Sequence, residues 1–300
     1  MSQSHTVWRD EPARERLEAW FERFRDKIPG PTESRQVETQ LGSSHVLLTG
    51  PSDAPPIVCL HAMRTGSAHL LSELGPLSEQ FRLVAPDLPG QSVRGPQTRP
   101  SLKDASLAEW LLEILDGLKL GSVNLFGVSW GGFVARQTAS TAPDRVRRLA
   151  LLVPAGIANG SHWTGLTRMA WPLLRYRLRS TEENLRRFLD PLLTTWDDDW
   201  ARFMGEGIRD MPFDPRIPPL AADAELARLT MPVLTVAAAD DISFPGESVV
   251  RRIKQAVPHA DAESLPDCKH CPPTTPAFRE TLSHRLARFF YPADGQPVNL

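Results

Sequence analysis

The sequence predicts an α/β fold in which a mostly parallel β-sheet is covered by helices on both faces. Apolar runs of strand length alternate along the chain with stretches of helical periodicity. The strand candidates are apolar at successive positions, as expected for strands that are buried on both faces of a parallel sheet. The chain has 300 residues, of which 41% are hydrophobic and 23% charged, so it can bury a large core and is not disordered.

Residues 1–35 are predicted to form a helical segment at the start of the chain. Apolar residues recur at helical spacing from Glu11 to Ile28, and a Pro-Gly-Pro sequence ends the pattern. Two short strands are then expected at Gln36–Thr39 and His45–Thr49. The sequence Gly42-Ser43-Ser44 between them indicates the turn of a hairpin.

Residues 36–158 and 231–292 are predicted to form the core of the fold. Its further strands are expected at Ile57–Leu60, Phe81–Ala85, Ser122–Phe126, Val146–Val153, Pro232–Ala238 and Ala262–Leu265. Its helices are expected at Ala68–Leu77, Ser106–Leu118, Trp130–Thr141, Gly246–Ala256 and Pro276–Phe290. Residues 293–300 are expected to form a loose tail.

One long stretch, residues 159–230, interrupts this alternation. It is rich in Trp, Leu, Arg and Pro and contains no convincing strand. Helices are expected at Thr164–Leu178, Thr181–Leu193 and Asp197–Arg209. We interpret the stretch as a helical insertion between two strands of the sheet.

Composition and charge exclude several classes of function. Lys and Arg number 34 and Asp and Glu 36, and the resulting net charge of -2 offers no basic surface for nucleic acid or an anionic membrane. Three cysteines are too few for a disulfide scaffold. Residues 1–15 lack the apolar core of a signal peptide, and the longest apolar run, residues 149–158, is too short to span a bilayer. We therefore expect a cytoplasmic protein with a small-molecule partner, no nucleic acid and no membrane.

The strongest functional signal is the sequence Gly127-Val128-Ser129-Trp130-Gly131-Gly132, between a predicted strand and a predicted helix. A serine hydroxyl is a poor nucleophile unless a base removes its proton and the backbone holds it exposed. The pattern G-x-S-x-G meets the second condition, because its glycines permit a tight strand-to-helix turn. A serine that merely caps a helix is the alternative, and the strand before it favours the nucleophile.

This turn and its surroundings resemble the α/β-hydrolase fold, and the resemblance extends over nearly the whole chain. The sequence His61-Ala62-Met63 resembles the family's oxyanion loop, and residues 85–92 are similar to its P-D-x-x-G-x-G-x-S segment. Two departures stand out: Ala62 replaces the usual glycine, and the second glycine of the other segment is missing. The resemblance identifies a serine-carboxylesterase-like member and implies that residues 159–230 form a cap over the active site.

The resemblance also implies the catalytic acid. In this family the nucleophile, the acid and the histidine follow one another along the chain. The loop that follows the predicted strand at residues 232–238 comes after Ser129 in the chain. By resemblance it places the acid at Asp241, four residues before Pro245. Asp240 is the neighbouring alternative, and an isolated Asp-Asp before proline would be an ordinary solvated turn.

His270 is the histidine that the resemblance selects as the base, because it lies in the loop after the last predicted strand. His284 is the competing candidate, but its neighbours indicate a residue on a helix surface. Cys268 and Cys271 flank His270 in a C-x-x-C pattern, which also occurs in metal and redox sites. The second half of a zinc site is missing from the sequence, so we expect two small residues packed around the histidine, with no metal and no cofactor.

Two further groups of residues complete the expected site. The resemblance implies an oxyanion hole formed by the backbone N–H groups of Met63 and Trp130, and His61 is expected to hold the first of these in place. Large apolar side chains in residues 159–230 either line the substrate pocket or attach the cap to the sheet, and the sequence does not decide between the two. These candidates are Trp163, Met169, Trp171, Trp196 and Trp200.

The leading prediction is a serine hydrolase that cleaves small to medium apolar carboxylic esters through an acyl-enzyme on Ser129. His270 would transfer the proton, and Asp241 would orient His270. The same triad also serves lactonases, C–C bond hydrolases, amidases and perhydrolases, and the fold can serve as a ligand receptor without turnover. A haloalkane dehalogenase is disfavoured, because an aspartate would stand in place of Ser129. The sequence does not determine the acyl chain, the alcohol or the oligomeric state.

Overall fold

The computed structural model describes residues 6–291, and within them the chain forms an eight-stranded sheet with the order β1-β2-β4-β3-β5-β6-β7-β8. β1 and β2 pair antiparallel, as do β2 and β4, and all other neighbours are parallel. The strands are β1 (Thr32–Thr39), β2 (Gly42–Thr49), β3 (Pro56–Leu60), β4 (Arg82–Pro86), β5 (Val123–Val128), β6 (Val146–Leu152), β7 (Val233–Ala238) and β8 (Asp261–Leu265). The mostly parallel sheet is therefore confirmed. The tail expected at residues 293–300 lies outside the described residues.

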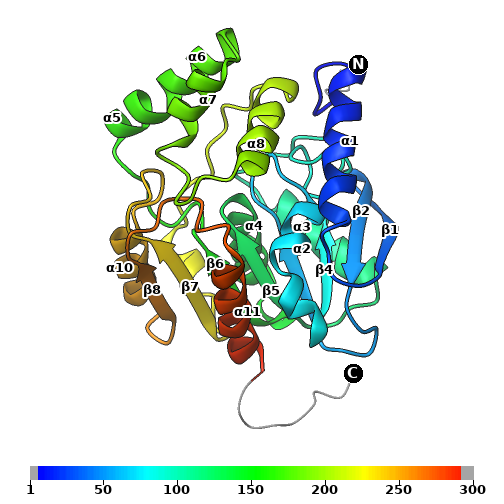
Figure 1. Ribbon diagram of the computed structural model, residues 1–300. Coiled ribbons are helices and arrows are strands. Elements are labelled where there is room, and N and C mark those ends of the chain that lie inside the picture. The colour runs from blue at the N-terminus through cyan, green and yellow to red at the C-terminus, as the bar shows by residue number, and fades with distance from the viewer. Residues whose placement is uncertain (1–5, 292–300) are drawn as a thin grey trace.

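Helices cover both faces of the sheet (Figure 1). The first face packs against α1 (Glu11–Arg25), α2 (Ser67–Glu73) and α11 (Pro276–Phe290), and the second against α3 (Ser106–Gly117), α4 (Trp130–Thr141) and α10 (Gly246–Ala256). Successive side chains of a strand point to opposite faces. In β3, Ile57 and Cys59 accordingly enter the first core, while Val58 and Leu60 enter the second. Burial on both sides explains why this strand is apolar at every one of these positions.

The first hairpin is longer than the sequence indicates. β1 begins at Thr32, inside the segment that was expected to be helical, and β2 begins at Gly42. The connecting residues are Gln40 and Leu41, so the prediction that Gly42-Ser43-Ser44 forms the turn was wrong. β1 is an edge strand in which Val37 alone is buried. Such a strand carries little hydrophobic alternation by which its start could be recognised.

Two expected helices end early, in each case at a proline. The helix expected at Ala68–Leu77 stops with α2 at Glu73, and a short 3₁₀ helix, η1 (Gly75–Glu79), follows it. The helix expected at Thr181–Leu193 is α7 (Glu182–Leu189), which ends shortly before Pro191. Proline has no backbone N–H, so neither Pro76 nor Pro191 can continue the hydrogen-bond ladder of the preceding helix.

Residues 159–230, which we call the inserted segment, lie between β6 and β7 in the chain, and the helices of this segment up to residue 210 lie beyond the carboxyl ends of the parallel strands in space (Figure 1). Its last residues instead return to the second face of the sheet, where Ala221, Leu226 and Leu229 join the core. Its helices are α5 (His162–Gly165), the π-helical η3 (Leu166–Ala170), α6 (Trp171–Leu178), α7, α8 (Asp198–Asp210) and α9 (Asp223–Leu226). The single helix expected at Thr164–Leu178 is thus three successive helical pieces. The segment has a small core of its own around Tyr176, Leu189 and Ile208. Among residues 6–291, no helix has both the length and the apolar character needed to cross a bilayer.

The turn from β5 into α4 lies against the end of β3. A Cβ atom at Gly131 would lie 2.1 Å from the carbonyl oxygen of Leu60, and one at Gly127 would lie 2.4 Å from that of Gly131. Both obstacles are backbone atoms, so they cannot move aside as a flexible side chain would. Glycine is therefore required at both positions, and its absence of a side chain lets α4 start directly beside β3.

We expect Gly131→Ala to destabilise the protein by at least about 1–3 kcal/mol, because the added methyl group overpacks a contact between two backbones. Urea unfolding followed by circular dichroism measures this change. Gly121→Ala is the matched control, since a Cβ there would meet no atom within 4 Å. Equal stability of the two variants would contradict the close approach of α4 to β3.

Candidate active site

Ser129 occupies a strained backbone conformation at the turn between β5 and α4. Its φ of 50° lies in the left-handed region, which residues other than glycine rarely adopt. The backbone is held there from both sides: the Ser129 N–H donates to Leu152 O at 2.9 Å, and Ser129 O accepts from the N–H groups of Phe133 and Ala155, each at 3.1 Å. The conformation projects the hydroxyl from the turn at the carboxyl end of β5.

The structure brings Ser129, His270 and Asp241 together in one line of hydrogen bonds. The Ser129 Oγ lies 3.0 Å from His270 Nε2, and His270 Nδ1 lies 2.7 Å from Asp241 Oδ2. The two alternatives lie elsewhere. Asp240 is exposed, and its N–H donates to Cys268 O, while His284 is exposed on α11.

The ionisation states of Asp241 and His270 depend on their burial, their mutual charge interaction and their hydrogen bonds. Burial by itself would raise the pKa of Asp241, but the charge of His270 and the N–H groups of Phe244 and Ser243 outweigh it and lower the pKa. Burial would likewise lower the pKa of His270, but Asp241 outweighs it and raises the pKa. An ionised Asp241 can only accept, so Nδ1 of His270 carries a proton. In the neutral imidazole, Nε2 is then free to accept the hydroxyl proton of Ser129.

The loop between β3 and α2 is held by His61 and Thr65. His61 is fully buried, and its Nε2 accepts the N–H of Leu88 at 2.9 Å, so Nδ1 bears the proton and donates to Ala62 O at 2.8 Å. The Thr65 hydroxyl donates to the same carbonyl at 2.8 Å. The C=O and N–H of a trans peptide point in opposite directions. Fixing the Ala62 carbonyl therefore directs the N–H of Met63 away from His61.

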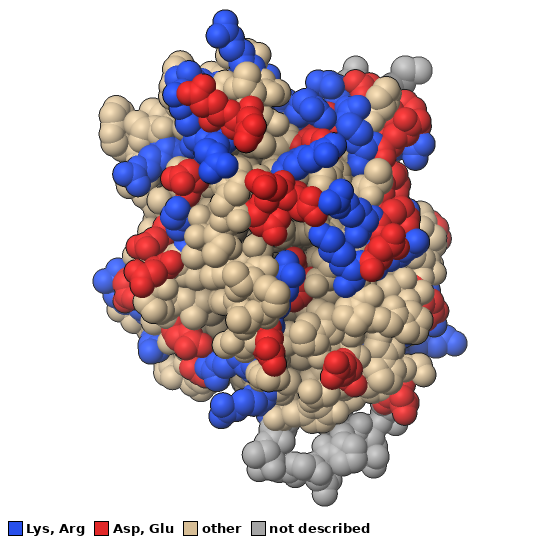
Figure 2. Space-filling model, viewed as in Figure 1, with Lys and Arg blue, Asp and Glu red and all other residues tan. Residues whose placement is uncertain are grey.

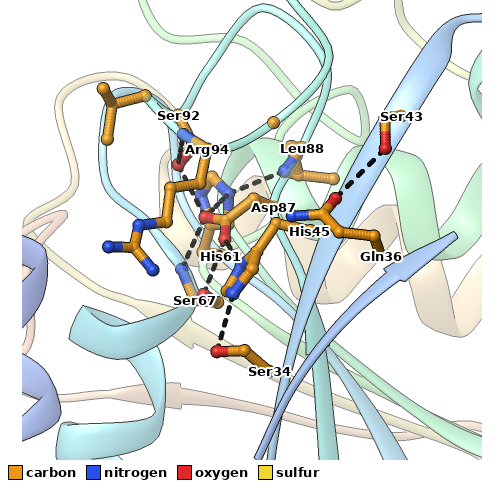
Figure 3. A network of polar contacts seen from close by, with 12 residues as sticks. Ser34, Gln36, Ser43, His45, His61, Ser67, Asp87, Leu88, Ser92 and Arg94 are labelled. Carbon is orange, nitrogen blue, oxygen red and sulfur yellow. Dashed lines mark hydrogen bonds and ion pairs between the residues drawn. The ribbon is translucent and has the colours of Figure 1, made fainter. Parts of the chain in front are cut away.

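A buried carboxylate, that of Asp87, lies next to His61 and stabilises the residues that follow this loop (Figure 3). It accepts hydrogen bonds from the N–H and hydroxyl of Ser67, the hydroxyl of Ser92 and Nδ1 of His45, at 2.6–2.9 Å. Ser67 is the first residue of α2, so Asp87 fixes the start of the helix that follows the loop. Burial would raise the pKa of Asp87, but His45, His61 and Ser92 lower it to about 2.

The two expected oxyanion donors belong to the loop after β3 and to the first turn of α4. Within the described residues, neither the N–H of Met63 nor that of Trp130 donates to a protein acceptor. The Trp130 side chain is buried, whereas Met63 is 38% exposed. Both N–H groups are therefore without a competing protein acceptor, as the expected oxyanion hole requires.

The five candidate pocket residues are placed in different surroundings. Met169 lies beside the loop of Asp241, where its Sδ accepts a hydrogen bond from the Ser243 hydroxyl at 3.3 Å. Trp196 stacks under Arg186, and Trp200 packs on His69 and donates to Glu73. Trp163 and Trp171 are 72% and 58% exposed. Met169 is thus the candidate that lies against the loop of Asp241.

Thr194 is a residue of the site that sequence reasoning missed. Its hydroxyl accepts the N–H of Lys269 at 2.9 Å and donates to Cys271 O at 2.8 Å, so it spans the two residues that flank His270. A parallel bridge between Leu193 and Cys271 reinforces this contact. The inserted segment therefore holds the loop of His270 directly. A single threonine that makes a contact this distant along the chain leaves no local signal in the sequence.

The two cysteines that flank His270, Cys268 and Cys271, pack around it as small side chains. Cys268 is buried, and burial raises the pKa of its thiol and raises that of Cys271 to about 12. In residues 6–291, no group of three or more His, Cys, Asp or Glu side chains is arranged to hold a metal ion. The thiols are therefore protonated near neutral pH, which makes them weak nucleophiles.

Comparison with known proteins places this geometry in a family context. The sequence model of the family described as alpha/beta hydrolase fold matches residues 55–275. Two Bacillus subtilis relatives are similar along most of their length. The one named uncharacterized carboxylesterase nap is 24% identical, covering 87% of this chain and 88% of the relative, and carboxylesterase YbfK is 26% identical, covering 81% and 83%. The crystal structure of naproxen esterase from Bacillus subtilis superposes with a TM-score of 0.79 at 22% identity, covering 94% of this chain and all of that one.

We expect Asp87→Asn to lower stability at neutral pH by roughly 2–4 kcal/mol, since an amide cannot accept all the hydrogen bonds that end on this buried carboxylate. Wild-type stability should also fall in acid. The folded pKa of about 2 lies below the ordinary value of 3.8, so this contribution is present above 3.8 and is lost as the pH falls towards 2. Urea unfolding between these pH values measures both effects. A variant with wild-type stability and the same acid dependence would contradict this role of Asp87.

Proposed function

The chain belongs to the alpha/beta hydrolase fold family, and we propose that it is a serine esterase that cleaves small to medium apolar carboxylic esters. The observation that carries the proposal is the line of hydrogen bonds from Ser129 through His270 to Asp241. Relatives that are named carboxylesterases and match more than four fifths of the chain support a hydrolase. The proposal adds the serine mechanism and the class of substrate.

In the proposed mechanism, Ser129 Oγ attacks the ester carbonyl carbon while its proton passes to His270 Nε2. The oxyanion that forms is stabilised by the N–H groups of Met63 and Trp130. His270 then gives the proton to the departing alkoxide, which leaves an acyl-enzyme on Ser129. A water molecule, deprotonated by His270, attacks the acyl-enzyme and releases the acid. Asp241 stays ionised throughout, orients the imidazole and stabilises its positive form.

We further propose that the inserted segment is the cap of this active site. It reaches both loops that carry the His–Asp pair, through Thr194 next to His270 and through Met169 next to Ser243. Its small core also includes Ile242, the residue that follows Asp241. Met169 and Ile242 thus place apolar side chains next to the proposed triad, which favours an apolar acyl or alcohol group over a charged one.

Ser129→Ala should abolish ester hydrolysis with a loss in kcat of about 10⁴-fold or more, because the nucleophile is removed from a turn that stays intact. The measurement is turnover of p-nitrophenyl esters of rising acyl length, with lactones and amides run beside them to test other uses of the triad. Ser140→Ala, farther along α4, is the control, since the Ser140 hydroxyl bonds only Gln137 O within its own helix. Near wild-type turnover by a pure, folded Ser129→Ala protein would rule out the serine mechanism.

Activity should rise with pH as His270 loses its proton, with a midpoint in kcat/KM above 6.5, the ordinary histidine pKa, because Asp241 raises the pKa of His270. Asp241→Asn removes this carboxylate, so burial should then move the midpoint below 6.5, and kcat should fall by about 10⁴-fold. Asp240→Asn is the matched control and should leave both quantities near wild type. Equal effects of the two substitutions, or an unchanged midpoint in Asp241→Asn, would show that Asp241 does not pair with the base.

A further inference from the structure

The outer face of α5, η3 and α6 exposes an unusual amount of apolar surface. Half of the large apolar side chains that are exposed in the described part of the chain lie on these short helices, with exposed fractions between 47% and 75%. Monomeric proteins rarely expose contiguous apolar patches without a function. The residues of this outer face are Trp163, Leu166, Trp171, Leu174 and Leu178.

The same helices have a second, inner apolar face that is already covered. Tyr176 is 5% exposed, and Met169 and Leu173 pack with it in the core of the inserted segment. Leu174 and Leu178 are four residues apart in α6, which keeps them on a common side of that helix. The exposed leucines therefore do not belong to the face that holds the helices to the protein.

Positive charge accompanies the outer face. Residues 162–180 contain four arginines and neither Asp nor Glu. Arg168, Arg175 and Arg179 are exposed, and none forms an ion pair with another described residue. The nearest acids along the chain are Glu182 and Glu183 in the first turn of α7, and Glu183 is bound to Arg187 of the same helix. These helices form the upper left edge of the molecule in Figure 1, where Figure 2 shows blue groups beside tan surface, with red groups next to them.

We propose that this outer face docks onto an anionic lipid surface. Trp and Leu side chains on one face of a short helix, with arginines beside them, are the pattern of helices that lie in the headgroup region of a bilayer. The arginines would contact lipid phosphates, and the apolar side chains would enter the layer beneath. A second copy of the chain fits this face less well, because a symmetric contact would bring the arginines of one copy against those of the other.

Docking in this way would place the active site next to the lipid. Met169, on the inner face of the same helices, contacts Ser243, two residues after Asp241. Esters dissolved in the lipid layer would thus reach the enzyme on the side where the cap meets the triad. This consequence rests on the proposed function, whereas the docking itself does not.

The direct test is binding of the full chain to vesicles of phosphatidylglycerol and of phosphatidylcholine, followed by co-sedimentation and tryptophan fluorescence. We expect at least about tenfold tighter binding to the anionic vesicles, weakened by added salt, because several arginines approach the charged surface. The emission of Trp163 and Trp171 should shift to the blue as these side chains leave water. Equal affinity for both lipids, or no binding to either, would overturn the proposal.

Variants separate the outer face from other surfaces. Leu174→Ser with Leu178→Ser, and separately Arg168→Glu with Arg175→Glu, should each weaken binding to phosphatidylglycerol by about tenfold or more. The matched controls are Ile217→Ser, at a side chain that is 72% exposed on another loop, and Arg251→Glu, at an exposed arginine on α10. Controls that weaken binding as much as the variants would overturn the proposal. All the substituted side chains are exposed, so we expect folded proteins, which circular dichroism verifies.

Two further outcomes distinguish the alternatives. A concentration-dependent dimer that Leu174→Ser with Leu178→Ser abolishes, without any vesicle binding, would assign the face to self-association and reject the lipid. Ser129→Ala should bind vesicles as the wild type does, because Ser129 lies apart from the outer face. An inactive protein that still binds anionic vesicles would therefore refute the proposed function while supporting the docking surface.

Discussion

The close approach of α4 to the end of β3 is the constraint on which the candidate site depends. With no side chain at Gly131, the helix starts against the Leu60 carbonyl, and Ser129 is held at a φ of 50°. The loop that follows Leu60 carries Met63, while the first turn of α4 carries Trp130. One glycine contact thus brings the proposed nucleophile and both proposed oxyanion donors to the same edge of the sheet. The proposed mechanism needs such pre-organised geometry, because donors that are fixed in place require no reorganisation during the reaction.

The titratable groups at this edge of the sheet are tolerated because each has partners that compensate for the cost of its desolvation. Asp241 is almost fully buried, and two backbone N–H groups and His270 compensate for its desolvation. His270 is in turn positioned by two separate parts of the chain. Asp241 binds its ring, and Thr194 binds the backbone on both sides of it. The inserted segment therefore does more than cover the sheet, because Leu193 and Thr194 also hold the backbone beside the histidine.

The sequence predicts those features that leave a local pattern. The central strands are recognisable because burial on both faces makes them apolar throughout, and α4, α10 and α11 begin and end where periodicity and prolines indicate. β1 was only partly predicted, because an edge strand with one buried residue has no such pattern. Ser129, Asp241 and His270 follow from motifs and chain order. Thr194 acts through a long-range contact, and the surroundings of the tryptophans are decided in the same way: Trp200 packs on the distant His69, whereas Trp171 is 58% exposed.

The inserted segment also shows why an average over the chain can mislead about partners. A net charge of -2 hides a stretch with four arginines and no acid, and a hydrophobic content of 41% says nothing of where those residues are exposed. A helix that is apolar on two faces gains stability from each face only when that face is covered. Full burial of a leucine or similar side chain contributes about 1.5–3 kcal/mol to the free energy of unfolding. The core around Tyr176 covers the inner face of α6, whereas Leu174 and Leu178 on the outer face stay 47% and 75% exposed. The exposed leucines and the arginines beside them are therefore the basis on which we propose a negatively charged lipid surface as the partner.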